Sequence, residues 1–200
     1  MMKTQIIKEH QLHLQGKLGA HMIHLRPLCD AHFPLLYKWN TDPDVLYWNE
    51  SPDADPNDEQ TVQTIYNQVS NAGYGFIIEL DDTAIGECLL CKVRVPYIEQ
   101  KYPTSTDLRR IDILIGEKDY WGMGIGTTVV QMLLKFAFEV EATDVIYGIT
   151  GDYNKRSGRV FEKNGFRLYH QCPTNNDPGE KGMELHFRLT RDEYKEATLD

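Results

Sequence analysis

A glycine-rich turn lies between a predicted strand and a predicted helix in the second half of the chain. The stretch EKDYWGMGIGTTVVQ, residues 117–131, places glycine at positions 122, 124 and 126 directly before an apolar run. The preceding RRIDILIG has the composition of a strand, and TTVVQMLLKFAFEVE has the length and composition of a helix. Because glycine leaves backbone N–H groups open and a helix N-terminus carries partial positive charge, this order predicts an anion cradle sized for a pyrophosphate. Glycines that merely fit a tight turn against the sheet are the alternative.

The register of the glycines excludes two familiar nucleotide loops. A dinucleotide loop needs G-x-G-x-x-G, but the third position falls on Thr127 counting from Gly122, and on Val129 counting from Gly124. A P-loop needs Lys directly after its last glycine, whereas the next lysine here is Lys135, deep in the predicted helix. A single pyrophosphate remains the best-supported ligand.

The remaining patterns predict one mixed α/β domain around a central twisted sheet flanked by helices. We expect an N-terminal extension over residues 1–20 and a single domain over residues 21–200, without repeats or linkers. Residues 96–108 are expected to form a loop, and an Asp81-Asp82 turn should join two strands into an antiparallel hairpin. Further strands are expected at 22–28, 75–80, 84–95, 109–116, 144–150 and 183–194, and helices at 33–39, 59–69, 127–141 and 154–166, the last closed by Gly165.

The charge balance argues against nucleic acid as a partner. Thirty acidic against 21 basic residues give a net charge of −9, so no phosphate-neutralising surface is implied. No window is long and apolar enough for a membrane span, and the N-terminus does not resemble a secretion signal, so a cytoplasmic protein is expected. The stretch from Trp39 to Cys91 contains no Lys or Arg but eleven acidic residues. It is either a solvated acidic face or a field that attracts a polycation.

Cysteine and histidine spacing gives no reason to expect a metal. Cys88 and Cys91 stand three apart in a predicted strand, where they point to opposite faces, so buried reduced thiols are the better interpretation. The histidine pairs 10/13 and 21/24 have no third ligand in register.

The sequence resembles a known family. The run IDILIGEKDYWGMGIGTTVV, followed by N-x-x-S and FEKNGF, is similar to the GCN5-related N-acetyltransferases, whose Q/R-x-x-G-x-G/A loop binds the pyrophosphate of acetyl-coenzyme A. The resemblance extends from about Ile23 to Leu189 and implies the GNAT fold, with a mostly antiparallel mixed sheet. It implies that acetyl-coenzyme A is the co-substrate, held by Trp121, Gly122, Met123, Gly124, Ile125, Gly126 and Thr127, with Trp121 in place of the family's Gln or Arg.

Within this family the chain most resembles the aminoglycoside 6′-N-acetyltransferases, which confer antibiotic resistance. HFPLLYKWNTDPDVLYW, the KYP loop and RIDILIGEKDYWGMGIGT carry that likeness. It implies a cationic small-molecule amine as acceptor, and either a monomer or a homodimer. Relatives that acetylate polyamines or protein N-termini share several of these features, and a coenzyme A sensor without catalysis is a further alternative.

Asp112 is the candidate catalytic base. It interrupts an apolar strand, Ile111-Asp-Ile113, where a carboxylate is intrinsically unfavourable, and an amine acceptor must lose a proton before it attacks the thioester. The resemblance supports this role, because the aminoglycoside enzymes carry an aspartate at the matching place in G-x-D-Q. A salt bridge with Arg109 or Arg110 is the structural alternative.

Other roles follow from the resemblance. The backbone at Leu114 and Ile115 should pair with the pantetheine arm, where one N–H can polarise the thioester, and Asn154 should contact the pantetheine or diphosphate. Two positions depart from the family: Phe161 replaces a tyrosine that protonates the leaving thiolate, for which Tyr153 or water could substitute, and Ile149 replaces a second substrate acid, for which Asp152 is the substitute.

Acceptor specificity is expected from the acidic segment. Trp48, Asn49 and Glu50 resemble the aromatic and acidic wall against which relatives pack aminosugar rings, and Asp53 and Asp55 would extend its negative rim. Trp48 as a half-buried packing residue is the alternative.

Overall fold

The computed structural model describes residues 7–174 and 182–199 and contains one mixed sheet with helices around it. The eight strands have the order β1-β2-β3-β4-β5-β6-β8-β7, so the predicted α/β class with a mixed, mostly antiparallel sheet is confirmed. The chain divides into two compact units. The first contains residues 1–91 and 113–129, and the second contains residues 92–112 and 130–200.

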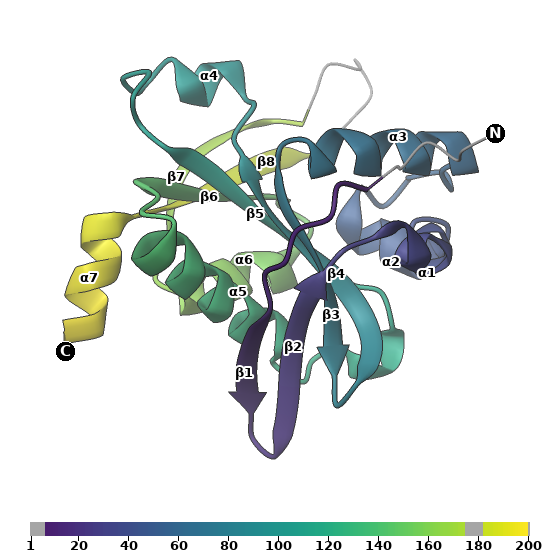
Figure 1. Ribbon diagram of the computed structural model, residues 1–200. Helices are drawn as coiled ribbons and strands as arrows, with labels where there is room; N and C mark the ends of the chain where they lie inside the picture. The colour runs from purple at the N-terminus through teal and green to yellow at the C-terminus, as the bar shows by residue number, and fades with distance from the viewer. Residues whose placement is uncertain (1–6, 175–181, 200) are drawn as a thin grey trace. The chain divides into compact units, whose positions relative to one another are not determined.

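The first unit contains an antiparallel meander whose strands lie side by side (Figure 1). Its strands are β1 (Leu14–Leu18), β2 (His21–Pro27), β3 (Gly73–Leu80) and β4 (Thr83–Lys92). The predicted β3–β4 hairpin is confirmed, and Asp81 and Asp82 form its turn with φ of 46° and 65°, a conformation that Asp tolerates better than most residues. Residues 14–18 of the expected extension form a strand paired with β2. The domain limits as such stay a prediction.

The first unit has four helical elements before β3 among the residues that the structure describes: η1 (Asp30–His32), α1 (Phe33–Trp39), α2 (Pro43–Asn49) and α3 (Glu59–Ser70). Two of them, α2 and α3, begin at an aspartate side-chain cap. The sequence predicted α1 and α3 but not α2, which begins at Asp42-Pro43, just after the end of α1. Asp42 accepts a hydrogen bond from the Asp44 amide as the N-cap of α2, and Pro43 occupies its first turn, where proline is favourable.

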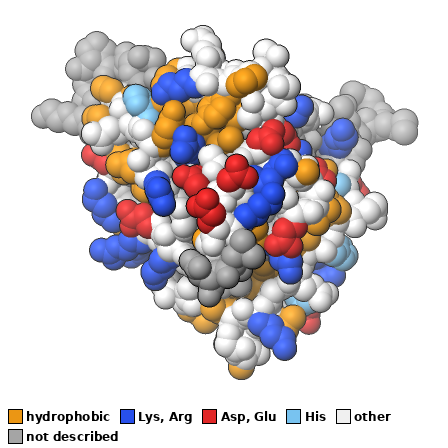
Figure 2. Space-filling view, turned by 90° about the vertical axis from the view of Figure 1, so that its left-hand side faces the viewer, with side chains coloured by type: hydrophobic (Ala, Val, Ile, Leu, Met, Phe, Trp, Pro, Cys, Tyr) orange, Lys and Arg blue, Asp and Glu red, His pale blue; other side chains and the backbone are white. Residues whose placement is uncertain are grey.

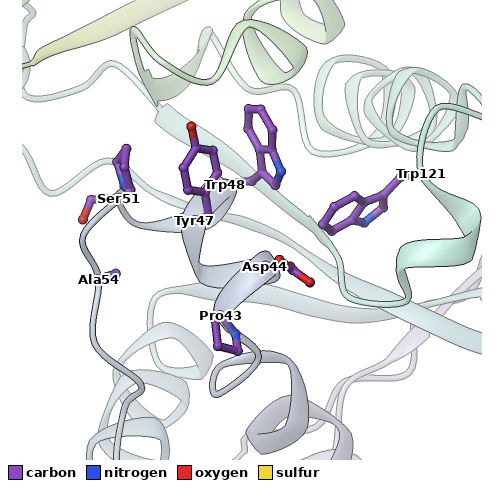
Figure 3. A pocket seen from close by; sticks show the side chains of 8 residues that line it. Pro43, Asp44, Tyr47, Trp48, Ser51, Ala54 and Trp121 are labelled. Carbon is purple, nitrogen blue, oxygen red and sulfur yellow. The ribbon is translucent and has the colours of Figure 1, made fainter.

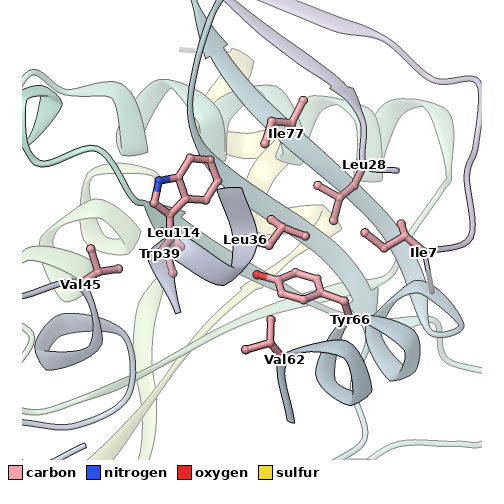
Figure 4. Close-up of a cluster of buried hydrophobic side chains, with 9 residues drawn as sticks. All are labelled: Ile7, Leu28, Leu36, Trp39, Val45, Val62, Tyr66, Ile77 and Leu114. Atoms are coloured by element: carbon pink, nitrogen blue, oxygen red, sulfur yellow. The ribbon is translucent and has the colours of Figure 1, made fainter. Parts of the chain in front are cut away.

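The apolar faces of these helices form the core of the first unit (Figure 4). Trp39, Leu36 and Val62 have no exposed side-chain surface, and they pack with Ile77 of β3 and Leu114. The helical spacing of these residues in α1 and α3 brings them to one face, and burying each large side chain stabilises the fold by about 1.5–3 kcal/mol.

A polar network crosses this core. Asn40 donates to the Tyr66 hydroxyl at 3.0 Å, and that hydroxyl donates to the carboxylate of Glu87, which is 7% exposed. Burial and the Glu87 charge raise the pKa of Tyr66 well above its ordinary value. The network supplies hydrogen bonds to a carboxylate that would otherwise be costly to bury.

The second unit contains the remaining strands. Its strands are β5 (Leu108–Ile115, whose last three residues belong to the first unit), β6 (Val145–Gly151), β7 (Arg167–Pro173) and β8 (Met183–Thr190). β5 pairs with β6 in parallel over Leu108–Arg110, and β8 is antiparallel to both β6 and β7. Its helical elements are α4 (Pro96–Glu99), α5 (Ile125–Lys135, shared with the first unit), the π-helical turn η3 (Phe136–Val140), α6 (Lys155–Lys163) and α7 (Arg191–Leu199); η2 (Lys118–Tyr120) lies in the first unit.

Three sequence predictions in this unit were wrong. The loop expected at 96–108 contains the short helix α4, which begins at Pro96 and packs Ile98 into a cluster with Val93 and Tyr147. Strand β7 was not predicted, and residues 191–194 begin helix α7 rather than continuing the last strand. Gly165 lies just beyond α6 with φ of 82°, as a helix-ending glycine should.

No helix within 7–174 or 182–199 is long and apolar enough to cross a membrane. On the face shown in Figure 2, Lys and Arg side chains lie among Asp and Glu side chains, so the net charge of −9 is not gathered into an acidic area there.

Candidate functional site

The glycine loop of the first unit is shaped by backbone conformation. Gly122 and Gly124 have φ of 81° and 87°, in the left-handed region that favours glycine. A Cβ on Gly122 would meet nothing within 4 Å, and one on Gly124 would lie an ordinary 3.7 Å from Leu18. The two glycines are therefore required by the turn itself and not by crowding. Gly126 lies inside α5, which begins two residues earlier than predicted.

The loop ends at the N-terminus of α5. The first hydrogen bond of this helix runs from the Thr128 amide to the Gly124 carbonyl, at 3.2 Å. The amides of Ile125 and Gly126 precede that bond, in the first turn, where helix geometry supplies no intrahelical acceptor. Together with the positive end of the helix dipole, they give the loop the N–H groups and field that a phosphate group needs.

Trp121 fastens the loop to the end of β5. Its indole N–H donates to the Ile115 carbonyl at 2.7 Å, and its ring packs against the core of the first unit. Met123, by contrast, is 42% exposed. Trp121 thus has a structural role of its own at the position where the family motif has Gln or Arg.

The end of β5, which precedes the loop, packs closely against neighbouring residues of the first unit. Gly116 and Glu117 both donate to the Ile85 carbonyl, at 2.9 and 3.0 Å. A Cβ on Gly116 would lie 2.1 Å from Cγ of Trp39, and one on Gly86 would lie 2.2 Å from the Leu114 carbonyl oxygen. Only glycine fits at positions 86 and 116. The close contacts that these glycines allow hold residues 113–115 in place within the first unit.

A cavity of about 540 Å³ lies beside the loop in the same unit (Figure 3). Trp48 and Tyr47 of α2 line it, together with Asp44 and Trp121. Trp48 of the predicted aromatic wall therefore lies on helix α2 and shares a cavity with Trp121, the first residue of the glycine loop. Ser51, Pro52, Ala54 and Pro43 complete the lining.

Several of the acidic residues near the cavity already have cationic or polar partners. Lys118 lies 3.1 Å from Asp42 and 2.7 Å from Asp44. Burial pushes the pKa of Asp42 up, but the hydrogen bonds from Lys118 and the Asp44 amide hold it below its ordinary value. Glu50 accepts a hydrogen bond from Asn57 at 2.8 Å. Lys118 thus neutralises part of the acidic charge of the segment from Trp39 to Cys91, which itself contains no Lys or Arg. This pairing weakens the expected attraction for a polycation.

In the second unit, Asp112 forms an ion pair within its own strand. Two nitrogens of Arg110, Nε and a terminal nitrogen, lie 2.9 and 2.7 Å from Oδ2 of Asp112. The Asp112 side chain is 30% exposed, but protein atoms crowd it enough that burial raises the pKa of its carboxyl, against the opposing pull of Arg110. A raised carboxyl pKa brings a base closer to neutral pH, where proton transfer is most efficient.

Arg109 takes no part in that pair. Its guanidinium contacts Asp107 at 3.0 Å and Glu141 at 3.3 Å, and its side chain is only 13% exposed. Alternation along β5 places it on the face opposite Arg110 and Asp112. Of the two arginines left open by the sequence, Arg110 is the partner of Asp112.

The remaining predicted site residues also lie in the second unit. Asn154 is the N-cap of α6, where its side-chain oxygen accepts from the Ser157 amide at 3.0 Å. Asp152 follows β6, and its backbone amide donates to the Met183 carbonyl at 2.8 Å. Their expected contacts with coenzyme A and acceptor stay predictions.

Phe161 is a core residue. It is 4% exposed and packs against Phe166 and Phe187, with ring centroids 5.2 and 5.7 Å away. A Cβ on Gly148 would lie 2.2 Å from the Phe161 ring, so the ring rests directly on β6. Phe161 therefore stabilises the fold, and its side chain has no proton that it could donate to the leaving thiolate.

The sequence did not identify Tyr47 and Asp44 as residues of the cavity. It also left Arg109 and Arg110 open as alternative partners of Asp112. The signal for the two cavity residues was present: Asp42-Pro43 is a cap followed by a favoured first helical residue, and a helix there brings Asp44, Tyr47 and Trp48 to one side at spacings of three and four. The signal for Arg110 was the period of two along the strand.

Comparisons with known proteins agree with this geometry. Residues 23–167 match the acetyltransferase (GNAT) domain model. An acetyltransferase of the GNAT family from Bacillus anthracis has a similar structure, with a TM-score of 0.71 and 17% identity over 90% of this chain and 99% of that chain. Aminoglycoside acetyltransferase AAC(6′)-Ib in complex with coenzyme A has a TM-score of 0.72 and 20% identity over 88% and 99% of the two chains.

Spermidine N-acetyltransferase from Vibrio cholerae, in complex with coenzyme A and spermine, is similar with a TM-score of 0.67 and 18% identity over 86% of this chain and 98% of that chain. At such identities the likeness concerns the fold, whereas the family match covers most of the chain and includes the whole glycine loop. The chain belongs to the GNAT acetyltransferase domain family, whose members are acetyl-coenzyme A-dependent N-acetyltransferases.

Proposed function

We propose that the protein transfers the acetyl group of acetyl-coenzyme A to a primary amine of a cationic small molecule, and that this amine is the 6′-amine of an aminoglycoside. The observation that carries the proposal is the cavity of about 540 Å³ in the first unit, where Trp48 and Tyr47 line the same space as Trp121 of the cofactor loop. An aromatic wall suits the face of a sugar ring.

The cofactor is proposed to bind through backbone groups. The amides of the loop and of the first turn of α5, including Gly124, Ile125 and Gly126, would hold its diphosphate. Backbone at Leu114 and Ile115 would pair with the pantetheine arm, with one N–H donating to the thioester oxygen as charge develops on it. Asn154 would contact the same arm.

Asp112 is proposed to accept the proton of the acceptor ammonium. The free amine then attacks the thioester carbon, the carbon–sulfur bond breaks, and the coenzyme A thiolate leaves. A thiol of pKa about 8.5 is a fair leaving group, so protonation by water suffices where Phe161 cannot donate. Asp152 and Glu50 would hold further ammonium groups of the acceptor.

A polyamine is the second candidate acceptor. The similarity to a spermidine N-acetyltransferase structure, at a TM-score of 0.67, favours it, since a linear polycation could lie along the same aromatic and acidic side chains.

The test is a panel of amines assayed by thiol release, with the products identified by mass spectrometry. The panel contains kanamycin-type aminoglycosides, spermidine and a peptide with a free N-terminus. We expect acetylation of the aminoglycosides at the 6′-amine with the highest kcat/KM of the panel. Turnover of spermidine or peptide with none of the aminoglycosides would refute the proposed acceptor and leave the enzyme class intact. Tight acetyl-coenzyme A binding without transfer to any amine would instead support a sensor.

A further inference from the structure

Three potential metal ligands converge on the last pair of strands in the second unit. The antiparallel register of β7 and β8 places Cys172 opposite Glu184, and alternation along β8 puts Glu184 and His186 on the same face. One ligand atom from each side chain lies within 4.8 Å of the other two. No local sequence pattern predicts this group, since Cys172 and His186 stand 14 residues apart and β7 was not predicted.

The spacing of the ligand atoms is close to that of a tetrahedral zinc site. Sγ of Cys172 lies 3.8 Å from Nε2 of His186 and 4.0 Å from Oε1 of Glu184. Ordinary zinc bond lengths at tetrahedral angles require about 3.6 Å for each of these separations. His186 and Glu184 are hydrogen-bonded to each other, and they must part to about 3.4 Å to admit an ion. Glu184 is 37% exposed, so its side chain has room to turn.

His186 directs its polar contacts into this cluster. Its side chain is 1% exposed, and within the described part of the chain its Nδ1 makes no hydrogen bond. The rings of Tyr97 and His170 pack around it, with centroids 5.7 and 5.6 Å away, and so limit its rotation. A preset imidazole reduces the entropy that metal binding would cost.

The charges of these side chains also suit a divalent ion. A thiolate, a carboxylate and a neutral imidazole carry two negative charges, which one Zn²⁺ balances. Sulfur and imidazole ligands favour zinc over magnesium or calcium, which prefer oxygen.

We propose that Cys172, Glu184 and His186 bind one zinc ion, with water as the fourth ligand. The site lies apart from the cofactor loop in the chain and cross-links β7 to β8. The zinc proposal does not rest on the identity of the acetyl acceptor, so failure of one proposal leaves the other standing.

The test is a zinc titration of the full-length protein in competition with a chromophoric chelator. We expect one equivalent of tightly bound zinc, and a loss of affinity of at least about tenfold in both Cys172→Ser and Glu184→Gln, since even outer-shell changes at zinc sites cost that much. Both substitutions keep side-chain size at partly exposed positions, and circular dichroism checks the fold of each variant.

Cys29 provides the matched control. Its sulfur lies 3.4 Å from Nδ1 of His32, but this pair belongs to no group of three ligands among the described residues. Cys29→Ser should leave the zinc affinity unchanged. Cobalt should give a sulfur-to-metal charge-transfer band that disappears in Cys172→Ser only. Less than one equivalent in the wild type, or zinc binding that survives Cys172→Ser and Glu184→Gln, would overturn the proposal.

Discussion

The proposed cofactor loop and the proposed base Asp112 are built in different ways. The loop from Trp121 to Thr127 depends on backbone: two glycines in the left-handed region and the first amides of α5. Asp112 depends on its side-chain surroundings: burial raises the pKa of its carboxyl, and the Arg110 guanidinium bound to it lowers that pKa. The loop should therefore tolerate side-chain changes that leave φ alone, whereas the behaviour of Asp112 should follow its neighbours.

Replacing Asp112 by Asn should lower kcat by about 10²- to 10⁴-fold, the usual contribution of a general base. The amide keeps the size of the carboxylate but cannot take the proton. Steady-state thiol release at saturating acetyl-coenzyme A measures the effect. Asp119→Asn, at an exposed acid of η2, is the control and should retain wild-type kcat. A kcat for Asp112→Asn within about twofold of the wild type would remove Asp112 from the mechanism.

Replacing Gly124 by Ala should weaken acetyl-coenzyme A binding about tenfold. The left-handed conformation costs a non-glycine residue about 1–2 kcal/mol, and the loop relaxes away from the binding geometry to avoid that cost. Calorimetric titration with acetyl-coenzyme A measures it. Met123→Ala, in the same loop but with an exposed side chain and an ordinary φ, should bind like the wild type. Equal losses in both variants would mean that side chains, and not backbone, hold the cofactor.

Replacing Trp48 by Ala should raise the KM for the amine by about two- to tenfold, the range expected for loss of one aromatic packing contact. The KM for acetyl-coenzyme A should stay unchanged. Tyr37→Ala, at a partly exposed aromatic of α1 outside the cavity, is the control. An unchanged KM for every amine in the panel would show that the cavity wall does not contact the acceptor.

Replacing Arg110 by Gln should shift the acid limb of the rate profile to higher pH. Burial raises the pKa of Asp112 and Arg110 lowers it, so loss of the guanidinium leaves burial unopposed. Because the base acts when ionised, activity is present above its pKa and is lost as the pH falls through it. The pH dependence of kcat/KM measures the shift. Arg109→Gln, which removes a cation bound to Asp107 and Glu141, should leave that limb in place. A shift in Arg109→Gln as large as in Arg110→Gln would contradict the pairing.

The contrast between backbone determinants and side-chain contacts also explains which features could be predicted from the sequence. The loop was predictable because its determinants are adjacent in the chain: a strand, two glycines and a helix start. The state of Asp44 was not predictable, since its partner Lys118 lies 74 residues away. Likewise, the cluster on β7 and β8 depends on strand register, which no local pattern revealed. Helix α2 was missed for another reason, because Asp42-Pro43 can end one helix or start the next.

The most direct test of the account is a steady-state kinetic comparison of Gly124→Ala and Asp112→Asn at varied acetyl-coenzyme A. We expect Gly124→Ala to raise the KM for acetyl-coenzyme A about tenfold with little change in kcat, and Asp112→Asn to lower kcat at least about 100-fold with little change in that KM. If both variants change the same parameter, the cofactor loop and the base do not have the separate roles assigned to them.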